Sequence, residues 1–390
     1  MKTEEMIDFV HRNAPCYLYD RGQITERCAV LRETLPGAAL LYSVKANPFA
    51  PVVRTIAAQG FGADAASAEE VLLAGREGIP AEKIFYSAPG KTERDLEKAW
   101  GRCTFIADSF SELERLETLA AERGEQLRVG VRVNPSFSMG GAAALPSKFG
   151  IDEEQILSSA WGYPHLTLGG IHVHLRSQVL DTDMLCAYYR DCLALAERIG
   201  ALPGAEIAFI NFGSGIGTVY DALREKPLAF EKIAETVRDL RRRSEAELLF
   251  ETGRFLVCNA GTYYARVTDR KVSRGKTFLV AESGMNGFLR PAVAELLRQN
   301  LGEFPSGGQE PLYTSATQCA FRVLGREGEL ERVDIVGSLC TALDVLARDI
   351  LLPRAEIGDI LAVSNAGSYG CTLSPQLFSS HEPPKEFLWE

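Results

Sequence analysis

A single lysine, Lys45, stands near the end of an apolar stretch that reads LYSVKANPF from Leu41 to Phe49. The Asn-Pro pair that follows turns the chain out of a strand, because the residue before a proline disfavours further regular structure. A lysine in partly apolar surroundings has its charged form disfavoured, and the free amine can then form a Schiff base with an aldehyde. This chemistry suggests pyridoxal phosphate as the cofactor.

That cofactor needs three further groups: a cradle for its phosphate, a partner for the pyridine nitrogen and a residue facing the ring. The stretch NFGSGIG, residues 211 to 217, has small residues that let backbone N–H groups approach a phosphate. The motif ETGR adds Glu251, a carboxylate that can keep the pyridine nitrogen protonated, and Arg254, a second phosphate ligand. A glycine loop alone is weak evidence, so the prediction depends on its combination with Lys45.

The elements that must position these residues are strand-like runs alternating with helix-like stretches. Eight such runs precede residue 255, at 38–46, 60–67, 84–89, 104–109, 127–134, 169–175, 206–215 and 247–254. Helical periodicity lies between most of them, at 68–77, 111–122, 182–200 and 227–244. Eight such units over about 230 residues predict a (β/α)8 TIM barrel. An open doubly wound sheet is the alternative, although that fold rarely needs eight units.

Barrel active sites gather at the C-terminal ends of the strands, and several polar residues of this sequence fall there. They are Lys45, Asp64, Ser67, Arg132, Asn134, His172, His174, Glu251 and Arg254. Any one of them alone is more simply explained as a solvated loop residue. Together they predict an active site.

After Arg254 the sequence becomes rich in β-branched and aromatic runs with few helical periods, which predicts a second, mostly β domain. The N-terminal run APCYLYDRGQI has the same character and precedes the first barrel strand. We therefore expect a barrel over residues 23–258 and a β domain made of residues 1–22 plus 259–390.

Composition excludes several classes of function. The 390-residue chain is 46% hydrophobic and carries a formal charge of -10, with one short basic cluster, Arg241 to Arg243, so nucleic-acid binding is not expected. Nine cysteines without CxxC spacing, an N-terminus unlike a signal peptide and the lack of a 20-residue apolar run predict a cytoplasmic protein without a membrane partner. Two histidines spaced i, i+2, His172 and His174, could bind a metal, but His11, His165 and His381 do not stand in motifs that suggest further ligands, so no metal is expected.

Eight motifs in this order resemble the fold-type III PLP-dependent decarboxylases, which include diaminopimelate, ornithine and arginine decarboxylases and are related to alanine racemase. They are YSVKAN, GADAASAEE, KFGI, HVHLRSQ, FGSGIG, ETGR, GSLC and NAGSYG. The similarity runs from about Pro15 to the C-terminus. It implies the barrel, the second domain and the cofactor named above.

The resemblance also implies roles for individual residues. Lys45 would be the Schiff-base lysine, His174 would stack on the ring, and Cys340 would reprotonate the decarboxylated carbon. Cofactor-binding positions would be Asp64, Arg132, Ser177, Gly213, Ser214, Gly215, Glu251, Gly253, Arg254 and Tyr369, with Glu70 in the surrounding layer. In this family Cys340 and Tyr369 come partly from a neighbouring subunit, which implies a homodimer with two shared sites.

Departures from the family pattern carry the information about substrate. Relatives acting on free diamino acids place an acidic residue directly after the cysteine, whereas Thr341 stands there in this chain. A neutral hydroxyl forfeits a charge-assisted bond to an ammonium, a loss on the order of 1.5 to 3 kcal/mol. Asp344, three residues later, could compensate. Arg290 matches a carboxylate-binding segment, but Ala294 replaces the usual tyrosine, and Arg176 adds a cation near the cofactor.

A substrate with a neutral or anionic far end fits these departures best. The CT.LD motif and the C-terminal tail look similar to a branch that decarboxylates conjugated amino acids, citryl-linked diaminopropionate or a carrier-bound glutamyl group, in siderophore and other secondary-metabolite biosynthesis. We therefore expect a decarboxylase of such a substrate. The alternatives are a meso-diaminopimelate decarboxylase, an amino-acid racemase and a non-catalytic, regulator-like relative.

Overall fold

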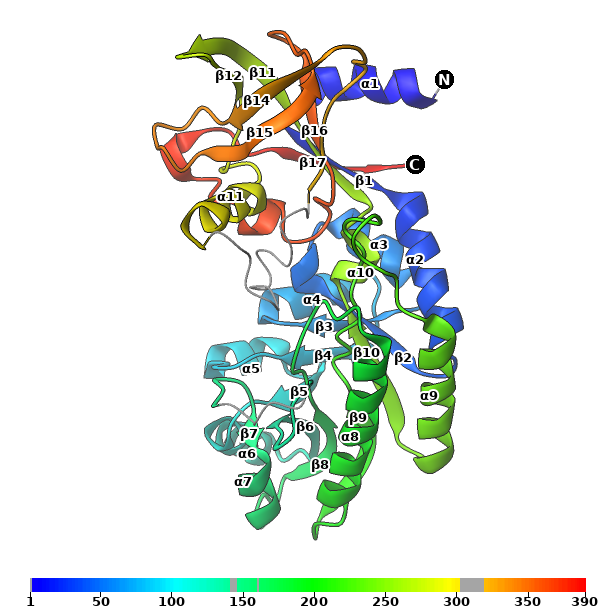
Figure 1. Cartoon of the computed structure of the whole chain (residues 1–390). Helices are drawn as coiled ribbons and strands as arrows, with labels where there is room; N and C mark the ends of the chain where they lie inside the picture. The colour runs from blue at the N-terminus through cyan, green and yellow to red at the C-terminus, as the bar shows by residue number, and fades with distance from the viewer. Residues whose placement is uncertain (1, 141–145, 160, 302–318) are drawn as a thin grey trace. The chain divides into compact units, whose positions relative to one another are not determined.

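The computed structural model describes residues 2–140, 146–159, 161–301 and 319–390, and it divides into two compact units. The barrel unit comprises Thr25–Gly217 and Lys226–Phe255. The β unit comprises Met1–Ile24, Thr218–Glu225 and Leu256–Glu390. Figure 1 labels the helices and strands of both units.

The barrel unit holds a closed ring of parallel strands, which confirms the predicted TIM barrel. Within the described ranges the eight strands are β2 (Ala39–Ser43), β3 (Gly62–Ala65), β4 (Ile84–Ser87), β5 (Thr104–Ala107), β6 (Leu127–Asn134), β8 (Leu166–His172), β9 (Ala205–Asn211) and β10 (Glu247–Thr252). Each of these strands pairs with the next one named, up to β9 with β10. The pairing of β10 with β2 then closes the ring. A short strand, β7 (Ile151–Asp152), adds to β6.

Apolar side chains from around the ring fill the barrel. Leu41, Phe85, Ile106, Phe209 and Leu249 form one buried cluster although they come from five different strands. Glycines make room for the largest of these rings: a Cβ on Gly130 or Gly170 would lie 2.8 Å or less from atoms of Phe209. The interior is therefore a packed core that fixes the strand ends in space.

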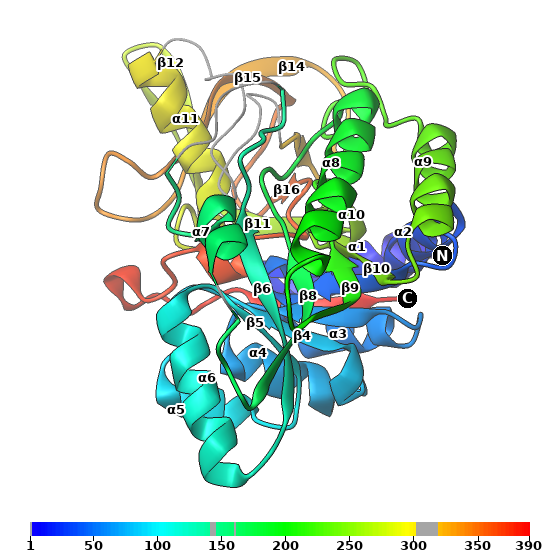
Figure 2. The same cartoon turned by 90° about the horizontal axis from the view of Figure 1, so that it is seen from below.

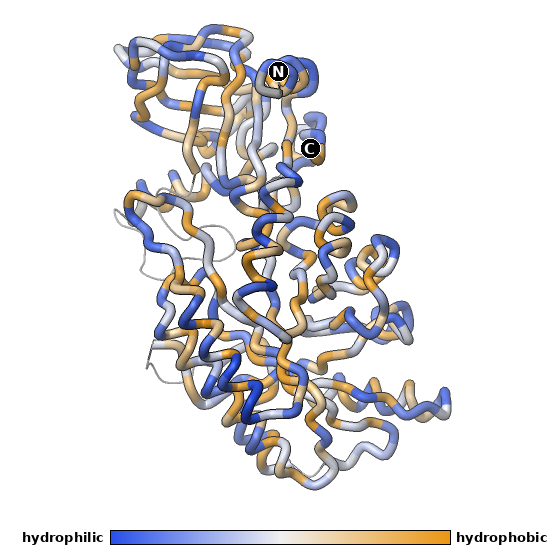
Figure 3. Tube along the Cα trace, turned by 90° about the vertical axis from the view of Figure 1, so that its right-hand side faces the viewer, coloured by the Kyte–Doolittle hydropathy of each residue, from blue (hydrophilic) through white to orange (hydrophobic). Residues whose placement is uncertain are grey.

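Amphipathic helices cover the outside of the strands (Figures 1 and 2). They are α2 (Arg21–Thr34), α3 (Ala50–Ala57), α4 (Ala68–Arg76), α5 (Glu93–Ala99), α6 (Phe110–Arg123), α7 (Glu153–Ser158), α8 (Thr182–Gly200) and α9 (Phe230–Arg243). Hydrophilic and hydrophobic residues alternate along them, as expected for helices with one face on a sheet (Figure 3). Among the residues that the structure describes, no helix is long and apolar enough to cross a membrane.

The β unit is built on strands that come from both ends of the chain. They are β1 (Cys16–Asp20), β11 (Gly261–Ser273), β12 (Lys276–Ala281), β13 (Phe321–Val323), β14 (Leu330–Val336), β15 (Val345–Pro353), β16 (Ile360–Val363) and β17 (Lys385–Trp389). The N-terminal strand β1 pairs with β11 on one side and with the C-terminal strand β17 on the other. Among its described residues this unit holds the helices α1 (Lys2–Asn13) and α11 (Leu289–Leu301), and the short α10 (Arg254–Val257) follows the last barrel strand.

Candidate active site

Lys45 lies in a single 3-10 turn, Val44–Ala46, directly after β2. Its Nζ donates to Oδ2 of Asp64 at 2.8 Å. Asp64 lies close to Lys45 because it pairs in register with Ser43, the last residue of β2, on the neighbouring strand β3. Ser87, on the next strand again, donates from Oγ to Oδ1 of Asp64 at 2.6 Å. Three successive strands thus fix one ammonium through one fully buried carboxylate.

Asp64 is ionised in this arrangement. Burial alone would raise its pKa, but the Lys45 charge and the hydrogen bonds from Lys45 and Ser87 outweigh burial and lower that pKa. The Lys45 side chain keeps 43% of its exposure, so its amine remains reachable from the barrel mouth.

Glu70 is a second carboxyl close to this pair. It sits in the first turn of α4, where the backbone N–H of Ala66 donates to Oε2 at 2.7 Å and Ser67 caps the helix. Burial raises the pKa of Glu70 to about 7, and the charge of Asp64 adds to the rise. One carboxyl of the group is therefore ionised and the other titrates near neutral pH.

His174 follows β8, and its Nε2 lies 3.1 Å from Oγ of Ser177. Burial lowers the pKa of His174 to about 3, so the ring is neutral at physiological pH, as a stacking residue should be. His172 ends the strand itself, with Nε2 3.3 Å from Oε1 of Glu251. The same Oε1 accepts a hydrogen bond from Nδ2 of Asn211 at 2.7 Å.

The glycine loop after β9 has an unusual backbone. Gly213, Ser214 and Gly215 have successive positive φ values of +62°, +144° and +76°, a region that glycine adopts readily. A Cβ on Gly213 would overlap Nδ1 of His174, and one on Gly215 would lie 2.8 Å from the Arg176 carbonyl oxygen. Only glycine fits these two positions without a shift of the neighbours.

The ETGR motif meets the lysine turn. Gly253 follows β10, and a Cβ there would lie 2.8 Å from Cβ of Ala46 and 3.1 Å from Cβ of Ser43, so glycine allows the two strand ends to approach. Arg254 comes next, 7% exposed, as the first residue of α10 rather than part of the strand. The barrel unit therefore brings Lys45, Glu251, Gly253 and Arg254 to one edge of two adjacent strands.

Arg132, Asn134 and Arg176 complete the predicted residues of the barrel unit. Asn134 ends β6, and its Nδ2 donates to Oδ1 of Asp152 at 2.8 Å. Arg132 lies on β6 in register with His172 of β8, with its side chain 11% exposed. Arg176 is exposed in the segment between β8 and α8.

The remaining predicted residues belong to the β unit. Cys340 is exposed and Thr341 half-buried in the turn between β14 and β15. Asp344 is 2% exposed and accepts hydrogen bonds from the backbone N–H groups of Met285 at 2.6 Å and Leu339 at 2.9 Å. In this structure the Asp344 carboxylate thus organises the loop that carries Cys340.

Arg290, at the start of α11, is fully buried within the β unit. Its guanidinium donates to the carbonyl oxygens of Asn365 at 3.3 Å and Ser368 at 3.2 Å, and to the Tyr220 hydroxyl at 3.3 Å. These bonds hold the segment just before Tyr369, which is half-buried and has a positive φ of +53°.

Sequence reasoning missed four residues that support the barrel site. Asn211 links two parts of it, since its Oδ1 accepts from the Gly213 N–H at 3.0 Å while its Nδ2 holds Glu251. Two adjacent tyrosines of α8 anchor the loops: Tyr188 donates to the Val173 carbonyl oxygen at 2.7 Å and Tyr189 to that of Ser214 at 2.7 Å. Ser87 is the fourth, and its place at the end of a strand-like run was the available signal.

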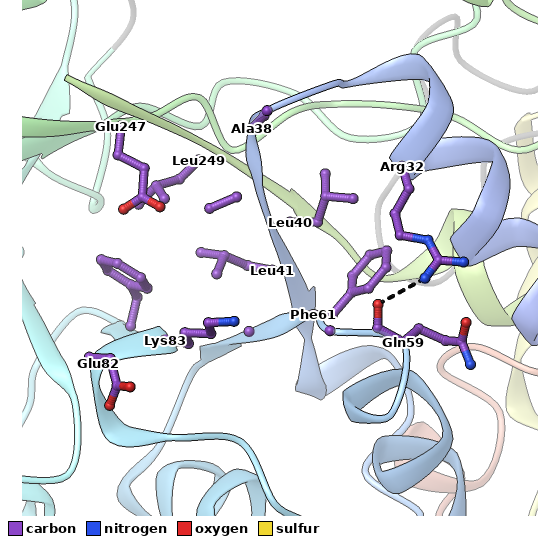
Figure 4. Close-up of a pocket in the computed structure, with 15 residues that line it drawn as sticks. Arg32, Ala38, Leu40, Leu41, Gln59, Phe61, Glu82, Lys83, Glu247 and Leu249 are labelled. Carbon is purple, nitrogen blue, oxygen red and sulfur yellow. Dashed lines mark hydrogen bonds between the residues drawn. The ribbon is translucent and has the colours of Figure 1, made fainter. Parts of the chain in front are cut away.

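A separate pocket of about 370 Å³ lies at the opposite end of the barrel strands. Leu40, Leu41 and Leu249 line it together with charged residues such as Lys83 and Glu247 (Figure 4). It opens among the N-terminal ends of the strands, where barrels place residues for stability. The pocket is therefore distinct from the site around Lys45.

The barrel residues fit pyridoxal phosphate. They offer an amine for the aldehyde, a cradle of positive-φ backbone for the phosphate, and Glu251 as a buried carboxylate for the ring nitrogen. When bound, this cofactor accepts the electron pair left on the α-carbon after carbon dioxide departs. No group of three or more histidine, cysteine, aspartate or glutamate side chains suited to a metal occurs in the part of the chain that the structure describes.

Comparisons with known proteins agree with this chemistry. Residues 21–258 match the family model for the pyridoxal-binding domain of pyridoxal-dependent decarboxylases. The chain is 33% identical to the L-glutamyl-[BtrI acyl-carrier protein] decarboxylase of Niallia circulans, covering 96% of this chain and 88% of that protein. It is 30% identical to the diaminopimelate decarboxylase of Zymomonas mobilis, with 92% and 84% covered.

A solved structure extends the similarity to three dimensions. Diaminopimelate decarboxylase from Helicobacter pylori, crystallised with L-lysine, superimposes with a TM-score of 0.84 at 26% identity, covering 99% of this chain and 94% of that one. The chain therefore belongs to the pyridoxal-dependent decarboxylases of the ornithine, arginine and diaminopimelate type, and it is a PLP-dependent amino-acid carboxy-lyase.

Proposed function

We propose that this decarboxylase removes the α-carboxyl group of an amino acid whose far end is conjugated or acylated. A glutamyl group on an acyl-carrier protein and a citryl-linked diaminopropionate are the two substrates of this kind that we consider. The observation that carries the proposal is Thr341, a neutral side chain directly after Cys340, where relatives acting on free diamino acids have an acid. A free distal ammonium would find no charge partner at that position.

The surroundings of Asp344 support the proposal. This carboxylate is the candidate that could replace the missing acid, yet it is buried and accepts two backbone N–H groups within its own loop. Turning it toward an ammonium would leave those donors unpaired, which costs about 1 to 3 kcal/mol for each buried group.

The relatives divide between two activities. The Niallia protein named above supports a carrier-bound substrate. The diaminopimelate decarboxylases support the rival activity on meso-diaminopimelate, which Arg290 was expected to favour by binding the distal carboxylate. Arg290 is instead fully buried and bonded to two backbone carbonyls, and this weakens the rival. Arg176, exposed beyond β8, supplies a cation suited to an anionic or acylated substrate.

In this proposal the barrel residues have separate tasks. The Lys45 amine would hold the cofactor through its aldehyde, and the neutral His174 imidazole would face the ring. Glu251 would be the carboxylate partner of the ring nitrogen. The Cys340 thiol delivers the proton to the α-carbon, and its exposed position leaves it accessible. The Gly213 loop, Ser177, Arg254 and Tyr369 would hold the phosphate.

Exchanging Thr341 for aspartate tests the substrate class. Carbon dioxide release is measured with free ornithine, lysine and meso-diaminopimelate and with a carrier-bound glutamate, and kcat/KM ratios are compared. A restored charge-assisted bond of 1.5 to 3 kcal/mol should shift selectivity toward the free diamino acids by about 10- to 150-fold. Thr341→Ser, which keeps the hydroxyl, is the matched control and should leave the ratio unchanged. Equal ratios for Thr341→Asp and wild type would contradict the proposal.

We also propose that the protein is a homodimer whose two active sites each take Cys340 and Tyr369 from the partner, as the family pattern implies. Mixing a Lys45→Ala variant with a Cys340→Ala variant tests this. Shared sites would restore about a quarter of the wild-type activity in the mixture, because half of the dimers become mixed and each of these has one intact site. No recovery after subunit exchange would contradict shared sites.

A further inference from the structure

Arg132 is a nearly buried cation whose hydrogen-bonding capacity is not used by its neighbours. Its side chain is 11% exposed, and its guanidinium makes no hydrogen bond to any residue in the described ranges. The register of β6 with β8 places Arg132 opposite His172, so both side chains lie on the same side of the sheet. Its charge also reaches His174, where it adds to the effect of burial in lowering the pKa of the ring.

Phe149 supports this guanidinium from one side. Arg132 Cζ lies 4.4 Å from the centroid of the Phe149 ring, within the range of a cation–π contact. Lys148 Nζ lies 4.9 Å from the same centroid. Because an aromatic face attracts a cation without using its N–H groups, the contact can fix the Arg132 side chain and leave its donors available.

Asp108 supplies the opposite charge. It follows β5, is 5% exposed, and has Oδ1 4.0 Å from Arg132 Nη1, too far for a hydrogen bond. That oxygen has no hydrogen-bond partner among the described residues. The other oxygen, Oδ2, accepts from the Gly150 N–H at 3.1 Å and so ties the segment carrying Phe149 to the same carboxylate.

Gly150 brings that segment against the strand. Its φ is +78°, and a Cβ there would lie 2.9 Å from the Arg132 carbonyl oxygen and from the Asn134 nitrogen. A buried ion pair lies behind Asp108: Lys91 Nζ donates to Glu112 at 2.6 Å, and both side chains are fully buried. Lys91 and Glu112 pair with each other, so neither replaces Asp108 as the carboxylate facing Arg132.

We propose that Asp108 and Phe149 are positioning residues for Arg132: they hold its guanidinium by charge and by ring contact, and leave its N–H groups to bind the cofactor complex beside His174. The two side chains act through Arg132 and not by touching the cofactor. The inference depends on the family's cofactor and not on the proposed substrate, so the failure of one leaves the other standing.

A double-mutant cycle on cofactor affinity tests this. Apoprotein of each variant is titrated with pyridoxal phosphate, and the dissociation constant is read from the absorbance of the bound cofactor. Arg132→Gln, Asp108→Asn and Phe149→Leu should each raise the dissociation constant by about 3- to 30-fold, the range expected for losing a contact of this kind. Asp108→Asn keeps an oxygen for the Gly150 N–H, and Phe149→Tyr should restore the affinity because it keeps the aromatic face.

Non-additivity decides the outcome. If Phe149 acts through Arg132, then Phe149→Leu should not weaken binding further when Arg132→Gln is already present. The control is Arg123→Met, which removes a similar cation–π contact to Trp100 (4.7 Å) on the outer helices and should leave cofactor affinity unchanged. Additive effects of the two substitutions, or normal affinity in Phe149→Leu, would overturn the proposal. A lower unfolding free energy with unchanged affinity would indicate a purely structural role and would also overturn it.

Discussion

Replacing Gly213 by alanine is expected to weaken both the fold and the cofactor site. The new alanine would have to keep the φ of +62°, which costs a non-glycine residue about 1 to 2 kcal/mol. It would also overlap Nδ1 of His174 and lie 2.8 Å from the Val173 carbonyl oxygen, and overpacking of this kind typically costs a further 1 to 3 kcal/mol. We therefore expect the unfolding free energy to fall by about 2 to 5 kcal/mol.

Gly124→Ala is a matched control for the backbone strain. Gly124 ends α6 with a φ of +64°, but nothing lies within 4 Å of a Cβ built there, so this variant bears the conformational cost alone. Urea unfolding of both apoproteins measures the stabilities, and titration with pyridoxal phosphate measures the affinities. The extra loss in Gly213→Ala should equal the overlap energy, and only this variant should lose cofactor affinity. Equal stabilities, or normal cofactor affinity in Gly213→Ala, would refute the account of the cradle.

Three further predictions concern the buried charges. Ser87→Ala removes a hydrogen bond to the ionised Asp64 and should cost about 1.5 to 3 kcal/mol of unfolding free energy at pH 7. Since the pKa of Asp64 is lowered in the fold, this loss of stability should shrink as the pH falls below about 4. A loss that does not change with pH would be contrary evidence. Because the pKa of Glu70 is raised to about 7, the folded state binds this proton more tightly than the unfolded state, and the unfolding free energy declines as pH rises from about 4.5 to 7. Urea titrations should therefore show Glu70→Gln becoming more stable relative to wild type over that interval. A difference in unfolding free energy that stays constant with pH would argue against the raised pKa. Lys91→Met leaves the buried Glu112 carboxylate without its charge partner and should lower the unfolding free energy by about 3 to 5 kcal/mol. Adding Glu112→Leu should recover much of that stability. No recovery would show that the ion pair is not the cause.

The barrel could be predicted because its signals are local. Each parallel strand is a short apolar run, and a polar residue such as Lys45, Asp64 or Glu251 follows its apolar stretch at the mouth. Once the runs are placed around a ring, the fold itself brings these residues together. The helix Thr182–Gly200 was predicted to the residue, since its apolar period is long and uninterrupted.

Other features depend on contacts that no local pattern reveals. Helix α11 lies in a region predicted to be mostly β; Pro291 stands in its first turn, where a proline is tolerated. Asp344 and Arg290 match substrate-binding positions by sequence. In the structure, however, Asp344 accepts from the Met285 and Leu339 N–H groups, and Arg290 donates to two carbonyl oxygens and the Tyr220 hydroxyl. Their assignment to the substrate stays a prediction.

The most direct test of the central claim is carbon dioxide release by the purified, cofactor-loaded protein. Carrier-bound glutamate and citryl-diaminopropionate are compared with meso-diaminopimelate, ornithine, lysine and arginine under the same conditions. The account predicts efficient release from one of the conjugates and little from the free diamino acids, because Thr341 leaves a distal ammonium without a charge partner. Efficient release from meso-diaminopimelate, with none from the conjugates, would contradict it.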